Sequence, residues 1–284
     1  EGNIQIGVPQ DSSSLNIQFL IDYFSPPPSG KPSSSPTLVF DQVEITDTRF
    51  RYFNSNYISP TSRSFDENNM VFSQLNGHLH DFTIIKDSIS FALDDIRGAE
   101  KSGLTIEDLH AQTIISSTTM EFTDLYLQTP QSTLRDYLRF SYSSYADFSD
   151  FYSKVNLKTN LTKSSIHTDD LAYFYTDLRR YNEMIKGTGT ITGTVDNLAS
   201  NKLHLELGSH ALRTGSAVVK GLPNINKTYF DLKAKTAKST ASDIAELANL
   251  DPAPKEFLAL EQLKYTGTFK GYIQNFDVNG DLTT

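Results

Sequence analysis

The sequence predicts a mainly β protein, a long curved antiparallel β-groove with a taco-like cross-section. Two patterns indicate this: apolar and polar residues alternate over many short stretches, and a Gly-rich strand pattern occurs twice. Composition agrees, because only 38% of the 284 residues are hydrophobic. That fraction suits a thin, sheet-rich body with much solvated surface better than one thick core.

The chain is expected to fall into four parts. Residues 1–24 are predicted to be the end of an upstream unit, and residues 25–36 a Pro/Ser-rich linker. Three consecutive prolines favour extended polyproline II, and the serine-rich remainder is flexible. Residues 37–167 are predicted to form one segment of the groove. Residues 168–284 are predicted to continue it through repeated units, each a helix followed by a Gly-rich strand.

Strict alternation, the period of a half-buried strand, is the commonest signal along the chain. Turn residues such as Asp94-Asp95 and Asp196-Asn197 separate these stretches. The pattern favours an antiparallel meander with one apolar and one polar face. The apolar positions that carry the alternation include Leu75, Leu79, Ile89, Phe91, Leu93, Met120, Phe122, Val155, Leu157 and Leu161, with Thr159 as a polar interruption.

Two stretches have a helical period, which predicts two short amphipathic helices. Thr168 is expected to be the N-cap of the first, before Asp169 and Asp170, whose charges suit a helix N-terminus. Its apolar stripe would be Leu171, Phe174, Tyr175, Leu178 and Tyr181. The second helix would begin at a Thr240 cap, present Ile244, Leu247 and Leu250, and end before Pro252 and Pro254. Residues 133–153 fit neither period and are expected to form a strand, then a turn or short helix.

An internal repeat links residues 189–198 (GTITGTVDNL) with residues 267–276 (GTFKGYIQNF). A third, weaker copy is LNGHLHDF at 75–82. The repeated glycines share parity with the apolar residues of their strands, so they lie on the apolar face. Because crowding on the inside of a bent sheet favours small residues, these glycines predict a trough with an apolar concave face.

Composition excludes several function classes. The formal charge of −9 argues against nucleic-acid binding and against bulk attraction to an anionic membrane surface. Cysteine is absent, so the chain has no disulfide, thiol nucleophile or thiolate metal site. No run approaches the ~20 apolar residues of a membrane helix. Glu1 is not an initiator Met, and no signal-peptide pattern follows it, so either a signal was removed or the chain is a piece of something longer.

Polar motifs give no strong site prediction. His78-x-His80 puts two imidazoles on one strand face, but the sequence offers no evident third ligand, so they are expected to be solvated surface histidines. Asp169-Asp170 is explained by a helix N-terminus and Glu107-Asp108 by a loop. No nucleophile elbow, P-loop or dinucleotide fingerprint is present. We therefore expect no catalytic residues, metal or cofactor.

The aromatic cluster at 140–152 allows two interpretations. Its residues would form a local minicore under a loop, or a lip that touches lipid or a partner. The members are Phe140, Tyr142, Tyr145, Phe148, Phe151 and Tyr152.

From about residue 37 to the end, the chain resembles the TamB/AsmA-like superfamily of Gram-negative envelope proteins. The resemblance rests on the Gly-rich strand motif, on the helix start at Asp170-Leu171-Phe174, and on the segments VEITDTRFRYFN (43–54) and FTDLYLQTPQSTL (122–134). It implies a periplasmic segment of a longer, inner-membrane-anchored protein that moves phospholipid to the outer membrane. It also implies an outer-membrane barrel-assembly partner.

Three functions follow as hypotheses. The first is a non-enzymatic conduit that shields phospholipid acyl chains in the groove. The second is a scaffold for outer-membrane protein assembly or translocation, which offers exposed edge strands to a client or to the barrel-assembly partner. The third is a structural module with a closed core. For the conduit, the predicted groove-lining residues are Ile191, Val195, Leu203, Leu205, Leu207, Leu263, Tyr265, Phe269 and Ile273.

Overall fold

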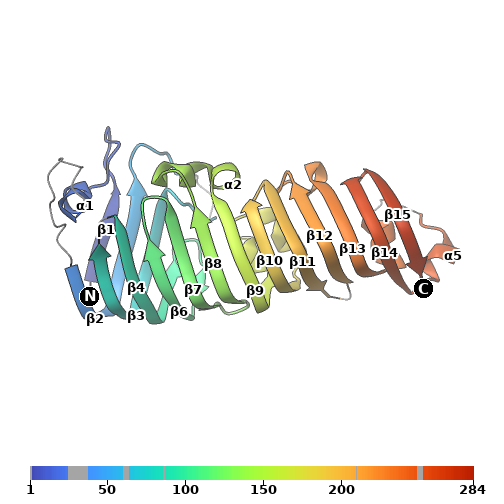
Figure 1. The fold of residues 1–284 in the computed structure, drawn as a ribbon, viewed down its shortest axis with the longest axis horizontal. Coiled ribbons are helices and arrows are strands. Elements are labelled where there is room, and N and C mark those ends of the chain that lie inside the picture. Colours follow the sequence, from blue (N-terminus) through green and yellow to red (C-terminus); the bar gives the residue numbers. More distant parts are fainter. Residues whose placement is uncertain (1, 25–37, 60–63, 86, 209, 248–251) are drawn as a thin grey trace.

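A computed structural model describes residues 2–24, 38–59, 64–85, 87–208, 210–247 and 252–284. The predicted linker at 25–36 and Leu250 lie outside these residues. The described chain forms one open sheet of 15 strands. The strands follow one another in chain order, so the molecule is elongated, with the two ends of the chain at opposite ends of the sheet (Figure 1).

Neighbouring strands are antiparallel from β2 to β15, as the alternation predicts. The short β5 pairs only with β4. The strands are β1 (Gly2–Val8), β2 (Leu38–Asn54), β3 (Asn69–Ile85), β4 (Ser88–Glu100), β5 (Thr105–Ile106), β6 (Asp108–Ile115), β7 (Thr119–Gln128), β8 (Thr133–Ser141), β9 (Asn156–His167), β10 (Met184–Thr194), β11 (Asn197–Leu207), β12 (His210–Lys220), β13 (Tyr229–Thr240), β14 (Gln262–Tyr272) and β15 (Asn275–Thr283).

The segment before the linker joins this same sheet. β1 pairs in parallel with the second half of β2, from Gly2 opposite Thr48 to Val8 opposite Asn54. The short helix α1 (Gln18–Phe24) follows β1. Whether residues 1–24 also belong to an upstream unit stays a prediction.

The remaining helices are short and lie in the connections between strands. They are η1 (Tyr145–Asp150), α2 (Phe151–Lys154), α3 (Thr168–Leu171), η2 (Thr176–Arg180), η3 (Ile225–Lys227), α4 (Ala241–Leu247) and α5 (Lys255–Leu258), where η marks a 3-10 helix. Residues 133–153 form a strand followed by short helices, as predicted. Within the described parts of the chain, none of these helices has the length and apolar character needed to cross a bilayer.

The first predicted helix, over 168–181, is wrong in its length and in its cap. The α-helix ends at Leu171, and a separate 3-10 turn begins at Thr176. The Tyr173 carbonyl accepts a hydrogen bond from the Phe65 backbone N–H (2.8 Å), and this tertiary bond replaces a helical one. The cap is His167, one residue before Thr168, and its Nδ1 accepts from the Asp169 N–H at 3.2 Å. The Thr240 cap is confirmed, since its hydroxyl accepts from the Asp243 N–H at 3.1 Å.

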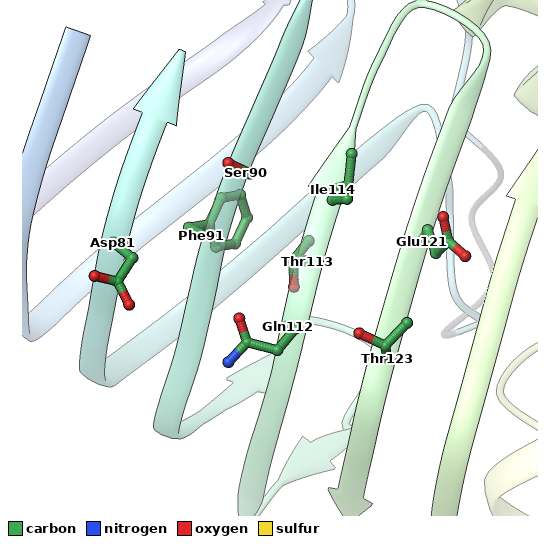
Figure 2. A pocket seen from close by; sticks show the side chains of 8 residues that line it. All are labelled: Asp81, Ser90, Phe91, Gln112, Thr113, Ile114, Glu121 and Thr123. Carbon is green, nitrogen blue, oxygen red and sulfur yellow. The ribbon is translucent and has the colours of Figure 1, made fainter. Parts of the chain in front are cut away.

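A line of β-bulges crosses the sheet from β2 to β13 and bends it. The strand register shifts once or more at successive pairs, and a residue in the left-handed region marks most of the shifts. Because each bulge bends its strand and increases the local twist, a row of bulges folds the whole sheet. Figure 2 shows strands around Asp81 and Phe91 bending, so that their other halves run behind. We call this line the crease; its left-handed residues include Asp47, Asp95, Asp124, Asp136, Lys163 and Lys202.

The repeated hairpins are equivalent in structure. Gly193 and Gly271 both have positive φ, and an added Cβ would lie 2.2 Å from the Asn197 carbonyl oxygen or 2.4 Å from the Asn275 carbonyl oxygen. No side chain fits there, so the backbone of the hairpin partner approaches the strand closely. The repeat thus preserves a hairpin geometry.

Candidate functional site

The concave face of the sheet carries an apolar row that crosses every strand from β2 to β15 except β5. Because directly paired residues of antiparallel strands point to the same face, the strand register defines this row. It contains apolar side chains and two glycines. We call it the rim row: Leu38, Ile84, Ile89, Ile115, Met120, Phe140, Leu157, Gly193, Leu198, Val219, Phe230, Gly271 and Phe276.

A second row runs beside it, closer to the crease. Its Phe82 and Phe91 rings stack with centroids 6.0 Å apart where the β3–β4 register shifts. Its only polar members are two threonines and a serine. We call it the deep row: Phe40, Phe82, Phe91, Thr113, Phe122, Leu138, Thr159, Ile191, Ser200, Ala217, Leu232, Phe269 and Val278.

Beyond the crease, a third row continues the apolar face on the other half of the sheet. We call it the far row: Ser164, Gly187, Leu205, Leu212, Ala237, Tyr265 and Leu282. The rim and deep rows therefore face the far row across the crease. This arrangement is a trough with apolar walls.

The floor of the trough is lined by buried side chains, several of which are small. The most buried positions of the deep row are Thr113 (2% exposed), Ala217 (4%) and Thr159 (5%). At the crease, Thr214 is 2% exposed, and its hydroxyl accepts from the Leu203 N–H at 3.2 Å. Leu161 and Leu203, close to the crease residues Lys163 and Lys202, are also buried, so the bend accepts large as well as small side chains.

The nine predicted lining residues fall into two groups. Seven lie in strands, on the apolar side by register or by alternation from a registered neighbour: Ile191, Leu203, Leu205, Leu207, Leu263, Tyr265 and Phe269. Val195 and Ile273 lie instead in the β10–β11 and β14–β15 turns. The predicted alternation was extended past the ends of these strands. The two side chains therefore belong to the edge of the trough. Contact of any of the nine with lipid stays a prediction.

The nine predicted lining residues include no member of the rim row. Leu198 and Ser200 have even numbers, whereas Leu203, Leu205 and Leu207 on the same strand have odd numbers. The bulge at Lys202 (φ 65°) changes the parity between the two halves of β11. Alternation read along one uninterrupted strand could not show this change.

The trough has two lips, formed by the connections at either end of the strands. Lip 1 includes residues 142–155 and 195–196, and lip 2 includes residues 64–68 and 168–183. Each connection of lip 1 joins two strand ends on the rim-row half of the sheet. Each connection of lip 2 joins two strand ends on the other half. α2 stands on lip 1, above β8 and β9, in Figure 1.

The aromatic cluster of lip 1 packs onto the trough. Phe140 belongs to the rim row, and the Phe148 and Phe151 rings lie 6.5 and 5.7 Å from its ring. Val155, at the end of this segment, is fully buried. The cluster is thus a minicore that covers the rim row at β8. This agrees with the minicore interpretation, and contact with lipid or a partner is untested.

The two lips touch at this point. The Tyr152 hydroxyl on lip 1 donates a hydrogen bond to the Phe174 carbonyl on lip 2, at 3.2 Å. Burial, together with the nearby Glu67 carboxylate of lip 2, raises the pKa of Tyr152. Phe174 also packs on Phe65, with ring centroids 5.0 Å apart. The trough is therefore bridged near its middle.

The apolar rows are open at the C-terminal end of the sheet. On β15, Phe276, Val278 and Leu282 are 46%, 51% and 56% exposed. β15 pairs with β14 on one side, and no described strand pairs with its other edge. The β2 end is similar, with Phe40 45% exposed. The two end strands of the described sheet do not pair with each other, so these strands do not form a closed barrel. The closed-core module stays a hypothesis.

A shallow depression of about 200 Å³ lies across β3, β4, β6 and β7. Most of its lining residues alternate with the apolar rows and so belong to the outer face, but Phe91 and Thr113 are members of the deep row. The lining residues are Asp81, Ser90, Phe91, Gln112, Thr113, Ile114, Glu121 and Thr123. Figure 2 shows these side chains spread over neighbouring strands and not converging on one point.

The paired acids noted in the sequence have structural contacts. Asp170 accepts hydrogen bonds from the hydroxyls of Thr129 (2.6 Å) and Ser132, which ties α3 to the β7–β8 turn. Glu107 accepts from the Gln128 side chain at 3.1 Å. Asp108 lies 2.7 Å from His110, a residue that the sequence did not single out. His78 and His80 do lie on one face, with their rings stacked 6.0 Å apart.

No family model matches the sequence, and neither a curated protein nor a solved structure is significantly similar to it.

Proposed function

We propose that this chain is a periplasmic segment of a TamB/AsmA-like envelope protein, whose trough is a non-enzymatic conduit for phospholipid acyl chains between the inner and outer membranes. The observation that carries the proposal is the pair of mostly apolar rows on the concave face, each of which crosses the sheet from β2 to β15. At ~4.8 Å between strands, thirteen strands give a track of roughly 58 Å. The family, the compartment and the membrane partners rest on the sequence resemblance.

The physical chemistry of the trough suits an acyl chain. Each buried methylene contributes about 0.8 kcal/mol, so a continuous track stabilises a long chain without specific contacts. The rim row offers no polar side chain that would hold a lipid at one position. The lipid headgroup can stay in water at the lips. It keeps its hydration there, so no desolvation cost arises.

The test is lipid loading of the wild type and of Leu205→Asp, both purified from cell envelopes. Native mass spectrometry and extraction of the same samples measure bound phospholipid. We expect phospholipid on the wild type and its loss in Leu205→Asp, because a carboxylate in the far row makes burial of acyl chains costly. Asn201→Asp is the matched control, since Asn201 is an exposed residue on the outer face of the same strand.

A photoactivatable acyl chain keeps the test decisive if Leu205→Asp fails to fold, as circular dichroism would reveal. In the wild type, labelling should fall on peptides of the rim and deep rows, including Leu198 and Phe230. A wild-type chain that carries no phospholipid, or labelling spread equally over the outer face, would overturn the proposal.

A second candidate function is supported by the open edges. The outward edge of β15 has no partner among the described strands. The first half of β2 pairs with β3 on one side only, since β1 covers only Thr48–Asn54 on the other side. Such edges suit β-augmentation of an outer-membrane client or of the barrel-assembly partner. Binding of unfolded outer-membrane strands by the wild type and by Leu205→Asp alike would favour this scaffold over the conduit.

A further inference from the structure

Histidine and aspartate side chains from three neighbouring strands meet on the outer face, beside the crease. They belong to β3, β4 and β6. Because these strands pair side by side, residues far apart in the sequence come together. The group consists of His78, His80, Asp94, Asp95, Asp108 and His110.

The distances suit metal coordination. Asp94, Asp95 and His110 each offer one ligand atom, and these atoms lie within 4.8 Å of one another. The His80 Nε2 lies 3.8 Å from Asp94 Oδ2. Zinc binds imidazole nitrogen and carboxylate oxygen at about 2.0–2.2 Å, which places neighbouring ligand atoms about 3–4 Å apart. Asp94, Asp95 and His110 already come close to that spacing, and a rotation of the His80 side chain toward Asp94 would add the fourth ligand.

A carboxylate also stands where a metal-bound histidine usually has one. The His110 Nδ1 lies 2.6 Å from Asp94, and its Nε2 lies 2.7 Å from Asp108. Metal-ligating histidines almost always donate their second ring N–H to a carboxylate, carbonyl or water, which fixes the ring orientation. With Nδ1 turned to a metal, Asp108 fills this role through Nε2. Two imidazoles distinguish the group from an ordinary acidic patch.

Three carboxylates surround the His110 ring: Asp94, Asp95 and Asp108 lie within 3.7 Å of its two nitrogens. Their negative charge attracts a cation to this part of the outer face.

We propose that His80, Asp94, Asp95 and His110 form a binding site for a divalent transition-metal ion, with zinc as the best match to the donor set. Imidazole nitrogen selects zinc, nickel or copper over magnesium and calcium, which prefer oxygen. The ion would cross-link β3, β4 and β6 next to the Asp95 bulge and so fix the crease. This proposal does not depend on what the trough carries.

The test is titration of the EDTA-dialysed wild-type chain with ZnCl₂ by isothermal calorimetry. Absorption of Co²⁺ in the visible range would report a low-symmetry nitrogen–oxygen site. We expect one equivalent of Zn²⁺ to bind, and we expect MgCl₂ to give no heat. Thermal unfolding with Zn²⁺ should occur at a higher temperature than in EDTA, because the ion binds only the folded site.

Variants identify the site. His110→Ala and His80→Ala should each weaken Zn²⁺ binding at least tenfold, and Asp108→Asn by about tenfold, as for an outer-shell partner. His204→Ala is the control, because His204 is a surface histidine on β11 whose ion-pair partner is Glu206 at 3.3 Å. Absence of a one-equivalent transition in the wild type, or unchanged affinity in His110→Ala, would overturn the proposal. Circular dichroism checks that each variant is folded.

Discussion

At the scale of single residues, the crease depends on residues whose backbone lies in the left-handed region, which most L-residues avoid. Left-handed conformations cost an L-residue about 1–2 kcal/mol, and Asp and Asn tolerate them better than most. Four of the crease residues named above are Asp placed within strands, at Asp47, Asp95, Asp124 and Asp136. Lys163 and Lys202 have no such local compensation, so the surrounding pairs must impose their geometry.

Lys202 therefore provides a test of the crease. Lys202→Val should destabilise the protein by about 1–2 kcal/mol, because a β-branched residue is strained at φ 65°. Lys202→Gly should be neutral or slightly stabilising, since glycine adopts this region freely. Urea midpoints at equal m-values measure both. Lys186→Val, at an exposed strand position without positive φ, is the control, and a loss there as large as in Lys202→Val would contradict the explanation.

At the scale of elements, the connections decide how the trough is covered. Phe174, Tyr175 and Tyr181 have helical spacing, yet this connection makes tertiary contacts in place of a long helix. The Tyr173 hydroxyl donates a hydrogen bond to the Gly103 carbonyl (3.0 Å). The Phe174 carbonyl accepts a hydrogen bond from the Tyr152 hydroxyl on the opposite lip. Periodicity can show which residues are apolar, but it cannot show that distant loops compete for their backbone groups.

Removal of one oxygen atom is expected to open the bridge between the lips. Tyr152→Phe removes the hydroxyl that binds the Phe174 carbonyl, so amides at 172–175 should exchange hydrogen faster. The loss in unfolding free energy should be about 0.5–1.5 kcal/mol, as for a single hydrogen bond. Hydrogen exchange with mass spectrometry of peptides from both lips is the measurement.

Tyr181→Phe is the matched control for the bridge. The Tyr181 hydroxyl accepts from the neighbouring Arg180 side chain at 2.7 Å and lies in the same connection. Exchange at 172–175 should be unchanged in this variant. Equal protection in Tyr152→Phe and the wild type would mean that the packing of Phe174 on Phe65, and not the hydrogen bond, holds the lips together.

At the scale of the whole molecule, an open sheet presents both a free backbone edge and apolar side chains at β15. Edges of this kind associate with other chains unless charge or a covering element prevents it. We expect the 284-residue chain to self-associate as its concentration rises. Val278→Lys should shift this association to higher concentration, because it puts a charge into the exposed end of the deep row.

Sedimentation velocity over a concentration series measures this association. Asn279→Lys adds the same charge to β15 on the outer face, and it should have the smaller effect if the apolar rows drive assembly. A chain that stays monomeric at every concentration, or equal effects of the two substitutions, would contradict this role of the apolar rows.

Much of the fold was predictable from alternation, because a meander pairs each strand with the next and the register needs no long-range information. β10 and β14, which keep one parity along their length, show this: Ile191, Tyr265 and Phe269 lie on the predicted face. The bulges were not predictable, since one extra residue leaves no mark on composition but reverses the parity. The His110 cluster was missed because its ligands come from three strands, and strand pairing alone brings them together.

The consecutive strand order has a consequence for how the protein folds and how it tolerates damage. Each strand packs mainly against its two neighbours in sequence, so the energetics approach those of a one-dimensional chain of nearest-neighbour interfaces. Folding can then begin at any favourable hairpin and spread in both directions, and short loop closures keep it fast. Damage to one hairpin should remain local, so a trough of this kind can lose a few strands at one end and keep the rest.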